Sequence, residues 1–180
     1  MTKILLDELR YPIGKYVKPT NFSDSDVQIY IERIENLPGR LRESVAGLND
    51  QQLDTPYRDG GWTIRQVVHH VADSHMNAYC RFKLGMTEDL PSIRPYDENL
   101  WAKTEDGLHG KPEHSLALLE NLHTRWVYFL RSLNSTDWQR KIYHPEAKIE
   151  YTLFQLLAMY AWHGDHHLGH IMSLLKRKNF

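Results

Sequence analysis

Four of the eleven histidines in this 180-residue chain fall within eight positions near its C-terminus. They are His163, His166, His167 and His170. On a helix, His163 and His167 are one turn apart and leave the same face, because they are four residues apart. Two imidazoles at this spacing are typical of ligands for a divalent metal ion.

The apolar residues around this pair indicate the direction of the two rings. Apolar side chains recur at steps of three and four residues, which is typical of an amphipathic helix, and the pair fills a gap in this stripe. An imidazole buried without a partner costs about 1–3 kcal/mol, so both rings must be hydrogen-bonded or bound to a metal. We prefer the metal; two core histidines held by tyrosine hydroxyls or water are the alternative. The stripe consists of Leu153, Leu156, Tyr160, Ile171 and Leu174.

Composition favours a globular chain in one domain spanning residues 1–180. The chain is 41% hydrophobic and 25% charged, with a formal net charge of −1, so it has no strongly basic surface for nucleic acid. No apolar run has the length of a membrane span. Cys80 is the single cysteine, and residues 1–7 lack the apolar stretch of a secretory signal. We therefore expect a cytoplasmic protein that binds neither nucleic acid nor membrane.

The first half of the chain contains two helical patterns. Apolar residues at seven-residue intervals predict an amphipathic helix over 23–48, with a kink at Pro38. Thr63 and Gln66 form a capping box that opens a second helix, which we expect to end near Gly85.

Two further helices are predicted in the second half. One starts at Pro112 and continues to Leu133, and the other begins at a second capping box, Thr152 with Gln155. Between them, residues 141–151 have the pattern of a short hairpin.

These elements predict an all-α fold, a four-helix bundle with a long insertion between its second and third helices and a short hairpin-like segment before the fourth. The insertion, residues 85–111, exceeds an ordinary connection, so we expect it to cover a binding pocket. Within it, Arg94 and Tyr96 are candidate substrate contacts. Residues 1–22 resemble an irregular arm laid over the core.

A metal site in a bundle draws ligands from facing helices, so the second helix should supply at least one more. It offers His69, His70, Asp73 and His75. Helical periodicity places His75 nearest the apolar face, and His70 and His69 on either side of it. Periodicity alone therefore favours His75, although this residue is equally compatible with a core histidine bonded to a carbonyl.

A resemblance bears on this choice. The segment Trp62–Asp73, followed by His163, His167 and Ile171, is similar to the paired signature of the DinB/YfiT-like family of metal-binding four-helix bundles. The likeness to the YfiT branch extends to three further segments, which are Leu9–Lys15, Arg94–Glu98 and His144–Glu146.

The resemblance implies that the three metal ligands are His70, His163 and His167. His170 stands where many relatives carry glutamine, so it is a candidate pocket residue. Asp73 is a candidate to orient a ligand ring from one turn away.

The remaining polar residues have ordinary interpretations. We expect His123 to be a hydrogen-bonded core residue and Asp165 to be solvated. Surface positions are expected for the other histidines of these helices and the insertion, which are His69, His109, His114 and His166.

Three neutral imidazoles leave a divalent ion with an open coordination position, which is typical of a catalytic site. Zinc is the first candidate, with nickel or iron(II) possible. The resemblance implies a bacillithiol-type thiol S-transferase, in which the ion activates a small-molecule thiol for attack on an electrophile. The alternatives are a metal-dependent hydrolase that uses metal-bound hydroxide and a non-catalytic, metal-stabilised bundle. The resemblance also implies a homodimer.

Overall fold

The computed structural model describes residues 6–180. Four long helices dominate it, and they are α2 (Asp24–Val45), α4 (Ile64–Thr87), α7 (Pro112–Leu130) and α9 (Leu153–Lys178). The shorter helices are α1 (Leu6–Arg10), α3 (Asp50–Leu53), α5 (Glu98–Trp101), α6 (Glu105–His109) and α8 (Ser135–Trp138). The strands β1 (Lys141–His144) and β2 (Ile149–Thr152) form an antiparallel hairpin. The predicted four-helix bundle, with its insertion and hairpin, is confirmed.

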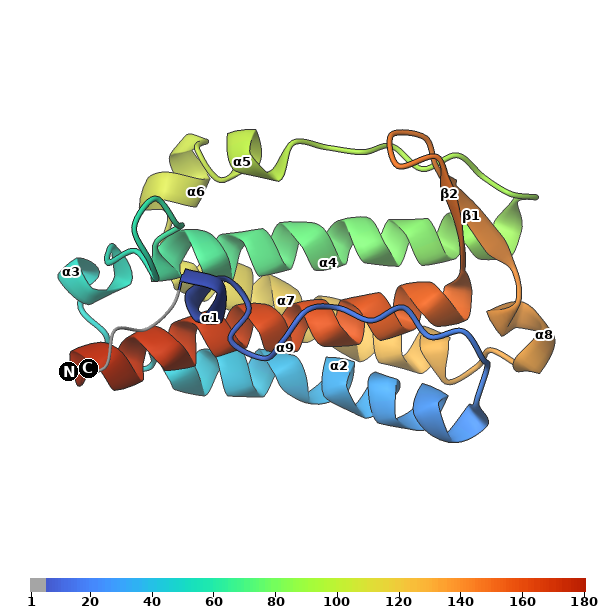
Figure 1. Ribbon diagram of the computed structural model, residues 1–180, viewed down its shortest axis with the longest axis horizontal. Coiled ribbons are helices and arrows are strands. Elements are labelled where there is room, and N and C mark those ends of the chain that lie inside the picture. The colour runs from blue at the N-terminus through green and yellow to red at the C-terminus, as the bar shows by residue number, and fades with distance from the viewer. Residues whose placement is uncertain (1–5) are drawn as a thin grey trace.

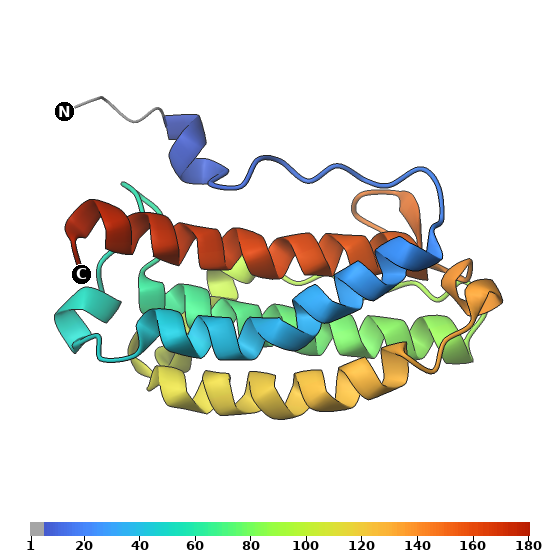
Figure 2. The same cartoon turned by 90° about the horizontal axis from the view of Figure 1, so that it is seen from below.

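The four long helices run side by side with α2 and α4 on opposite corners (Figures 1 and 2). Both α2 and α4 pack against α7 and α9. The facing helices of the predicted metal site are therefore α4 and α9, which are direct neighbours.

Local sequence signals place the starts of the helices that form the site. Thr63 and Gln66 exchange reciprocal hydrogen bonds at the start of α4, and Thr152 and Gln155 do the same at the start of α9. Pro38 lies inside α2, and this helix changes direction along its length in Figure 2, as expected where a proline interrupts the hydrogen-bond ladder.

The core between the helices is divided into two apolar clusters. On α7, Trp126 belongs to one cluster and Leu119 to the other, and the buried His123 lies between them. On α4, the fully buried His75 occupies the corresponding position. A layer of histidines therefore crosses the bundle between two apolar halves.

The arm and the insertion follow the two helices of the predicted site. The arm from α1 to α2 follows α9 (Figures 1 and 2) and is fixed to Gln155, which donates from Nε2 to the carbonyl of Pro19 at 3.2 Å. The insertion follows α4, where Gln66 Nε2 donates to the carbonyl of Ala102 at 2.7 Å. The first five residues of the expected arm lie outside the described part. Within residues 6–180, no helix has the length and apolar character needed to cross a membrane.

Candidate metal centre

Three histidines from α4 and α9 converge on one point. One ring nitrogen from each of His70, His163 and His167 lies within 4.8 Å of the other two. Nε2 of His70 and Nε2 of His163 are 3.2 Å apart. Two nitrogens bound to one tetrahedral ion at 2.0–2.1 Å are separated by roughly 3.3 Å. The donor set and its spacing therefore fit a zinc-like ion.

Two of these rings come from α9 and the third comes from α4. His163 and His167 follow one another at a single turn of α9, as their spacing predicts. His70 comes from α4 and packs edge-on against His167, with ring centroids 4.7 Å apart. Trp62, just before α4, closes one side with its ring centroid 4.5 Å from that of His70.

Burial keeps the three rings neutral. It lowers the pKa of His70 to about 4, and it lowers the pKa values of His163 and His167 well below the ordinary value for histidine. At pH 7 each ring therefore has a nitrogen lone pair, which is the form that binds metal.

The site opens into a cavity of about 550 Å³. The cavity walls come from the arm, the loop before α4, the insertion and the hairpin, in addition to α4 and α9. Three arginines line it, namely Arg10, Arg58 and Arg81. The cavity is therefore large enough for a small molecule and offers cationic groups to an anionic one.

Several buried polar atoms of this cavity have no hydrogen-bond partner among the described residues. Such atoms are rare in folded proteins unless a ligand or solvent completes them. They are Arg58 Nε, the indole nitrogen of Trp162, and Nδ1 of His166, His167 and His170. The walls of the cavity therefore offer unpaired polar nitrogen atoms to a polar molecule.

The two candidate residues of the insertion have different positions. Tyr96 lines the cavity, and burial raises the pKa of its hydroxyl to about 12. The side chain of Arg94 is exposed and is not part of the cavity wall, while its backbone carbonyl accepts a hydrogen bond from Arg81 at 3.5 Å. The cation at this side of the cavity is Arg81, which also donates to the Tyr160 hydroxyl at 2.7 Å. No local pattern in the sequence marks Arg81.

The candidates Asp73 and His170 have different surroundings. Asp73 is partly buried, and in residues 6–180 its carboxylate has no hydrogen bond to a ring of the three. Burial and the nearby carboxylate of Asp106 raise the pKa of Asp73 to about 6. His170 lines the cavity, stacks on Tyr57 with ring centroids 4.0 Å apart, and donates from Nε2 to the carbonyl of Arg10 at 3.1 Å.

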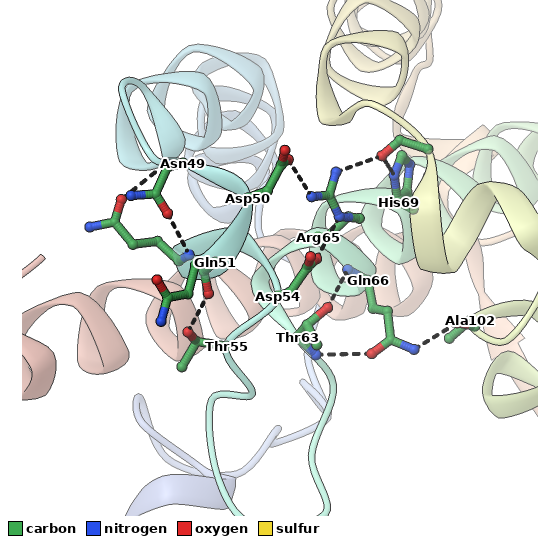
Figure 3. A network of polar contacts seen from close by, with 12 residues as sticks. Asn49, Asp50, Gln51, Asp54, Thr55, Thr63, Arg65, Gln66, His69 and Ala102 are labelled. Atoms are coloured by element: carbon green, nitrogen blue, oxygen red, sulfur yellow. Dashed lines mark hydrogen bonds and ion pairs between the residues drawn. The ribbon is translucent and has the colours of Figure 1, made fainter.

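Two histidines expected at the surface are buried. His69 donates from Nε2 to the carbonyl of Gly110 at 3.1 Å and accepts a hydrogen bond at Nδ1 from the Ser115 hydroxyl at 2.7 Å. Figure 3 shows this ring beside Arg65, turned toward the start of α7. His166 lines the cavity and stacks on Trp162 with ring centroids 4.4 Å apart. The prediction failed because α6 and the arm cover faces of α4 and α9 that a single helix pattern shows as polar.

The exposed positions predicted for His109 and His114 are confirmed. Asp165, in contrast, is not simply solvated, because it forms ion pairs with Arg33 Nε at 2.7 Å and Arg40 at 2.6 Å. His75 is fully buried, as helical periodicity predicts, but it lies outside the group of three nitrogens. Its hydrogen bonds are with His123 and His163 instead.

Comparison with known proteins gives the family. Residues 33–171 match the model of the DinB superfamily. A protein of Geobacillus thermodenitrificans named "Putative metal-dependent hydrolase" is 53% identical over 97% of this chain and 98% of its own length. YfiT of Bacillus subtilis, which has the same designation, is 49% identical over 94% of this chain and 95% of its own length.

The fold agrees with a solved structure. The structure of YfiT from Bacillus subtilis, described as an unusual four-helix bundle topology, superimposes with a TM-score of 0.94 at 48% identity, covering 96% of this chain and 99% of that one. Sequence and structure agree over nearly the whole length, and the chain therefore belongs to the DinB superfamily.

Proposed function

We propose that this chain is an enzyme in which His70, His163 and His167 hold one divalent ion, and that it transfers a small-molecule thiol to an electrophile. A bound ion would supply a Lewis acid that lowers the pKa of a thiol in the cavity. Zinc is the first candidate, and nickel or iron(II) suits the same imidazole set. The fit of the three nitrogens to one ion supports the metal part of the proposal.

The observation that carries the proposal is the make-up of the cavity beside the three histidines. Its walls combine neutral imidazoles with arginines, and Cys80, the single cysteine of the chain, is exposed and outside the cavity. The protein therefore offers no thiol of its own in the cavity, and a thiol nucleophile would have to arrive with a substrate. Arg58 and Arg81 suit a thiol that carries anionic groups. Bacillithiol, which the resemblance implies, is our first test compound.

Metal-dependent hydrolysis is the second candidate. The names of the relatives favour it, since they are designated as metal-dependent hydrolases. Glu98 and Glu146 line the cavity and are the carboxylates available there as a general base. Both side chains are exposed to solvent and are not enclosed in the site. We therefore rank hydrolysis below transfer. A homodimer in the cytoplasm stays a prediction.

One experiment separates the two reactions. The protein is loaded with one equivalent of zinc or nickel and mixed with bacillithiol and an alkylating electrophile, and the conjugate is measured by mass spectrometry. Transfer predicts conjugate only when both metal and thiol are present, and calorimetry in buffers of different ionisation enthalpy should detect a proton released on thiol binding near pH 7. Metal-dependent cleavage of an ester or amide without thiol, and without this proton, would favour the hydrolase instead. Folded, metal-bound protein with neither activity would favour a non-catalytic bundle.

A matched pair of variants tests the cationic wall. Arg81→Met removes a cation that lines the cavity, so KM for an anionic thiol should rise about tenfold, which corresponds to about 1.4 kcal/mol. Arg94→Met removes an exposed cation outside the cavity and should leave KM unchanged. Equal effects of the two substitutions would contradict the assignment of Arg81.

A further inference from the structure

A chain of hydrogen bonds leads from the candidate metal centre through the core to α2. Nδ1 of His163 is 3.3 Å from Nε2 of His75, and Nδ1 of His75 is 2.9 Å from Nε2 of His123. Nδ1 of His123 is 2.6 Å from the backbone oxygen of Ile34. This series of hydrogen bonds thus joins α9, α4, α7 and α2 in one layer of the bundle.

The two middle histidines are sealed from solvent. His75 is 0% exposed and His123 is 2% exposed, and their rings lie nearly parallel, with centroids 5.0 Å apart and planes inclined by 3°. Burial lowers the pKa of His123 to about 4 and the pKa of His75 well below its ordinary value. Each ring is therefore neutral at pH 7, with one N–H donor and one lone pair.

The donor and acceptor of each hydrogen bond in this series follow from its last acceptor, the backbone carbonyl of Ile34. A backbone carbonyl can only accept, so His123 must carry its hydrogen on Nδ1 and accept at Nε2. His75 must then donate from Nδ1 and accept at Nε2. His163, in turn, must donate from Nδ1, which leaves its Nε2 with a lone pair. Nε2 is the atom of His163 that faces His70.

Pro38 explains why the carbonyl of Ile34 is available. In a regular helix this oxygen would accept from the backbone N–H four residues later, and that residue is Pro38, which has no N–H. The proline therefore frees a carbonyl inside the bundle, and Nδ1 of His123 takes the position of the missing donor.

We propose that His75 and His123 are positioning residues that fix the ring and tautomer of His163, so that its Nε2 lone pair is directed toward the metal site. Without them, His163 would be free to place its hydrogen on Nε2, and this would block the atom required as ligand. Donation of the Nδ1 hydrogen to His75 also makes Nε2 a stronger electron donor. The inference rests on the proposed metal site for its purpose, but the arrangement of hydrogens can be tested without metal.

The first test measures tautomers in the metal-free wild-type protein. Long-range ¹H–¹⁵N correlation spectra of histidine-labelled protein distinguish a protonated Nδ1 from a protonated Nε2. We expect the Nδ1–H form for His163, His75 and His123 together. An Nε2–H form of His163 or His75 would overturn the proposal, whatever the metal content of the protein.

The second test measures zinc affinity by competition with a chelator. His75→Leu removes the acceptor for His163 Nδ1–H and should weaken zinc binding about 10–100-fold, the usual effect of losing a partner of a ligand. His75→Gln should restore affinity to within about threefold, because a side-chain amide oxygen can accept the same hydrogen. Wild-type affinity in a folded His75→Leu protein would overturn the proposal.

His123→Leu tests the remote link. It leaves His75 intact but removes the acceptor that holds the hydrogen of His75 on Nδ1. We therefore expect the spectrum of His163 to show both tautomers, and we expect zinc to bind more weakly. Thermal unfolding of each variant separates misfolding from loss of positioning. An unchanged tautomer of His163 in the folded His123→Leu protein would contradict the role of His123. If the wild-type protein bound no zinc at all, the proposed function would fail, and the spectra would still decide whether the chain of hydrogen bonds exists.

Discussion

Nε2 of His70 and Nε2 of His163 lie 3.2 Å apart, although 93 positions separate these residues in the sequence. The first belongs to α4 and the second to α9. Two neutral imidazoles held this close, with His167 beside them, form a preorganised group that could hold a metal ion.

We predict that alanine at His70, His163 or His167 abolishes stoichiometric metal binding, because two imidazoles hold an ion far more weakly than three. Metal content after dialysis, measured by mass spectrometry, checks this. His69→Ala is the matched control, since that ring is buried on the same helix but is bonded to Gly110 and Ser115. Full metal content in His167→Ala would contradict the site.

We predict that Asp73→Asn stabilises the metal-free protein at neutral pH. The pKa of Asp73 is raised in the folded state to about 6, so the folded protein holds a proton that the unfolded chain has released. Stability from this group is therefore present below the unfolded value, near pH 4, and is lost as the pH rises through about 6.

The expected gain from Asp73→Asn is about 1–2 kcal/mol at about pH 7.5, after allowance for the partial exposure of the group, and close to zero near pH 4. Urea unfolding with a chelator present, at both pH values, measures the difference. A gain of equal size at both pH values would contradict the raised pKa.

We predict opposite effects of alanine at two helical glycines. A methyl group at Gly164 of α9 would overlap the buried Leu37 of α2, so Gly164→Ala should lower the free energy of unfolding by about 1–3 kcal/mol. Gly39 of α2 is exposed and has nothing near its Cβ position, so Gly39→Ala should raise it by about 0.5–1 kcal/mol. Denaturant unfolding of both variants tests the close packing of α2 on α9.

We predict that the insertion contributes to activity through Tyr96. Tyr96→Ala should lower kcat/KM about tenfold, or about 1.4 kcal/mol, with metal content unchanged, because this ring lines the cavity without contributing to the three nitrogens. Leu100→Ala is the control, since Leu100 is 62% exposed and lies outside the cavity wall. A normal rate in Tyr96→Ala would contradict a role of Tyr96 in substrate binding.

Much of the fold follows from local signals in the sequence. The spacing of apolar residues identifies the four long helices, because each must bury one stripe. The capping boxes at Thr63 and Thr152 place two helix starts to the residue, because a side chain three positions away completes the hydrogen bonds of the first turn. The pairing of His163 with His167 follows from helical geometry alone.

The position of each side chain relative to other helices was decided by the tertiary structure. Periodicity correctly buries His75, yet His70 is the residue of α4 that joins His163 and His167 in the group of three nitrogens, and only the resemblance indicated this from the sequence. Arg81, rather than Arg94, reaches the cavity. Contacts of this kind depend on how four apolar faces pack at once and on which loop covers each polar face. A pattern within one helix contains no information about its neighbour's rotation or the path of a covering segment, so only the folded chain determines them.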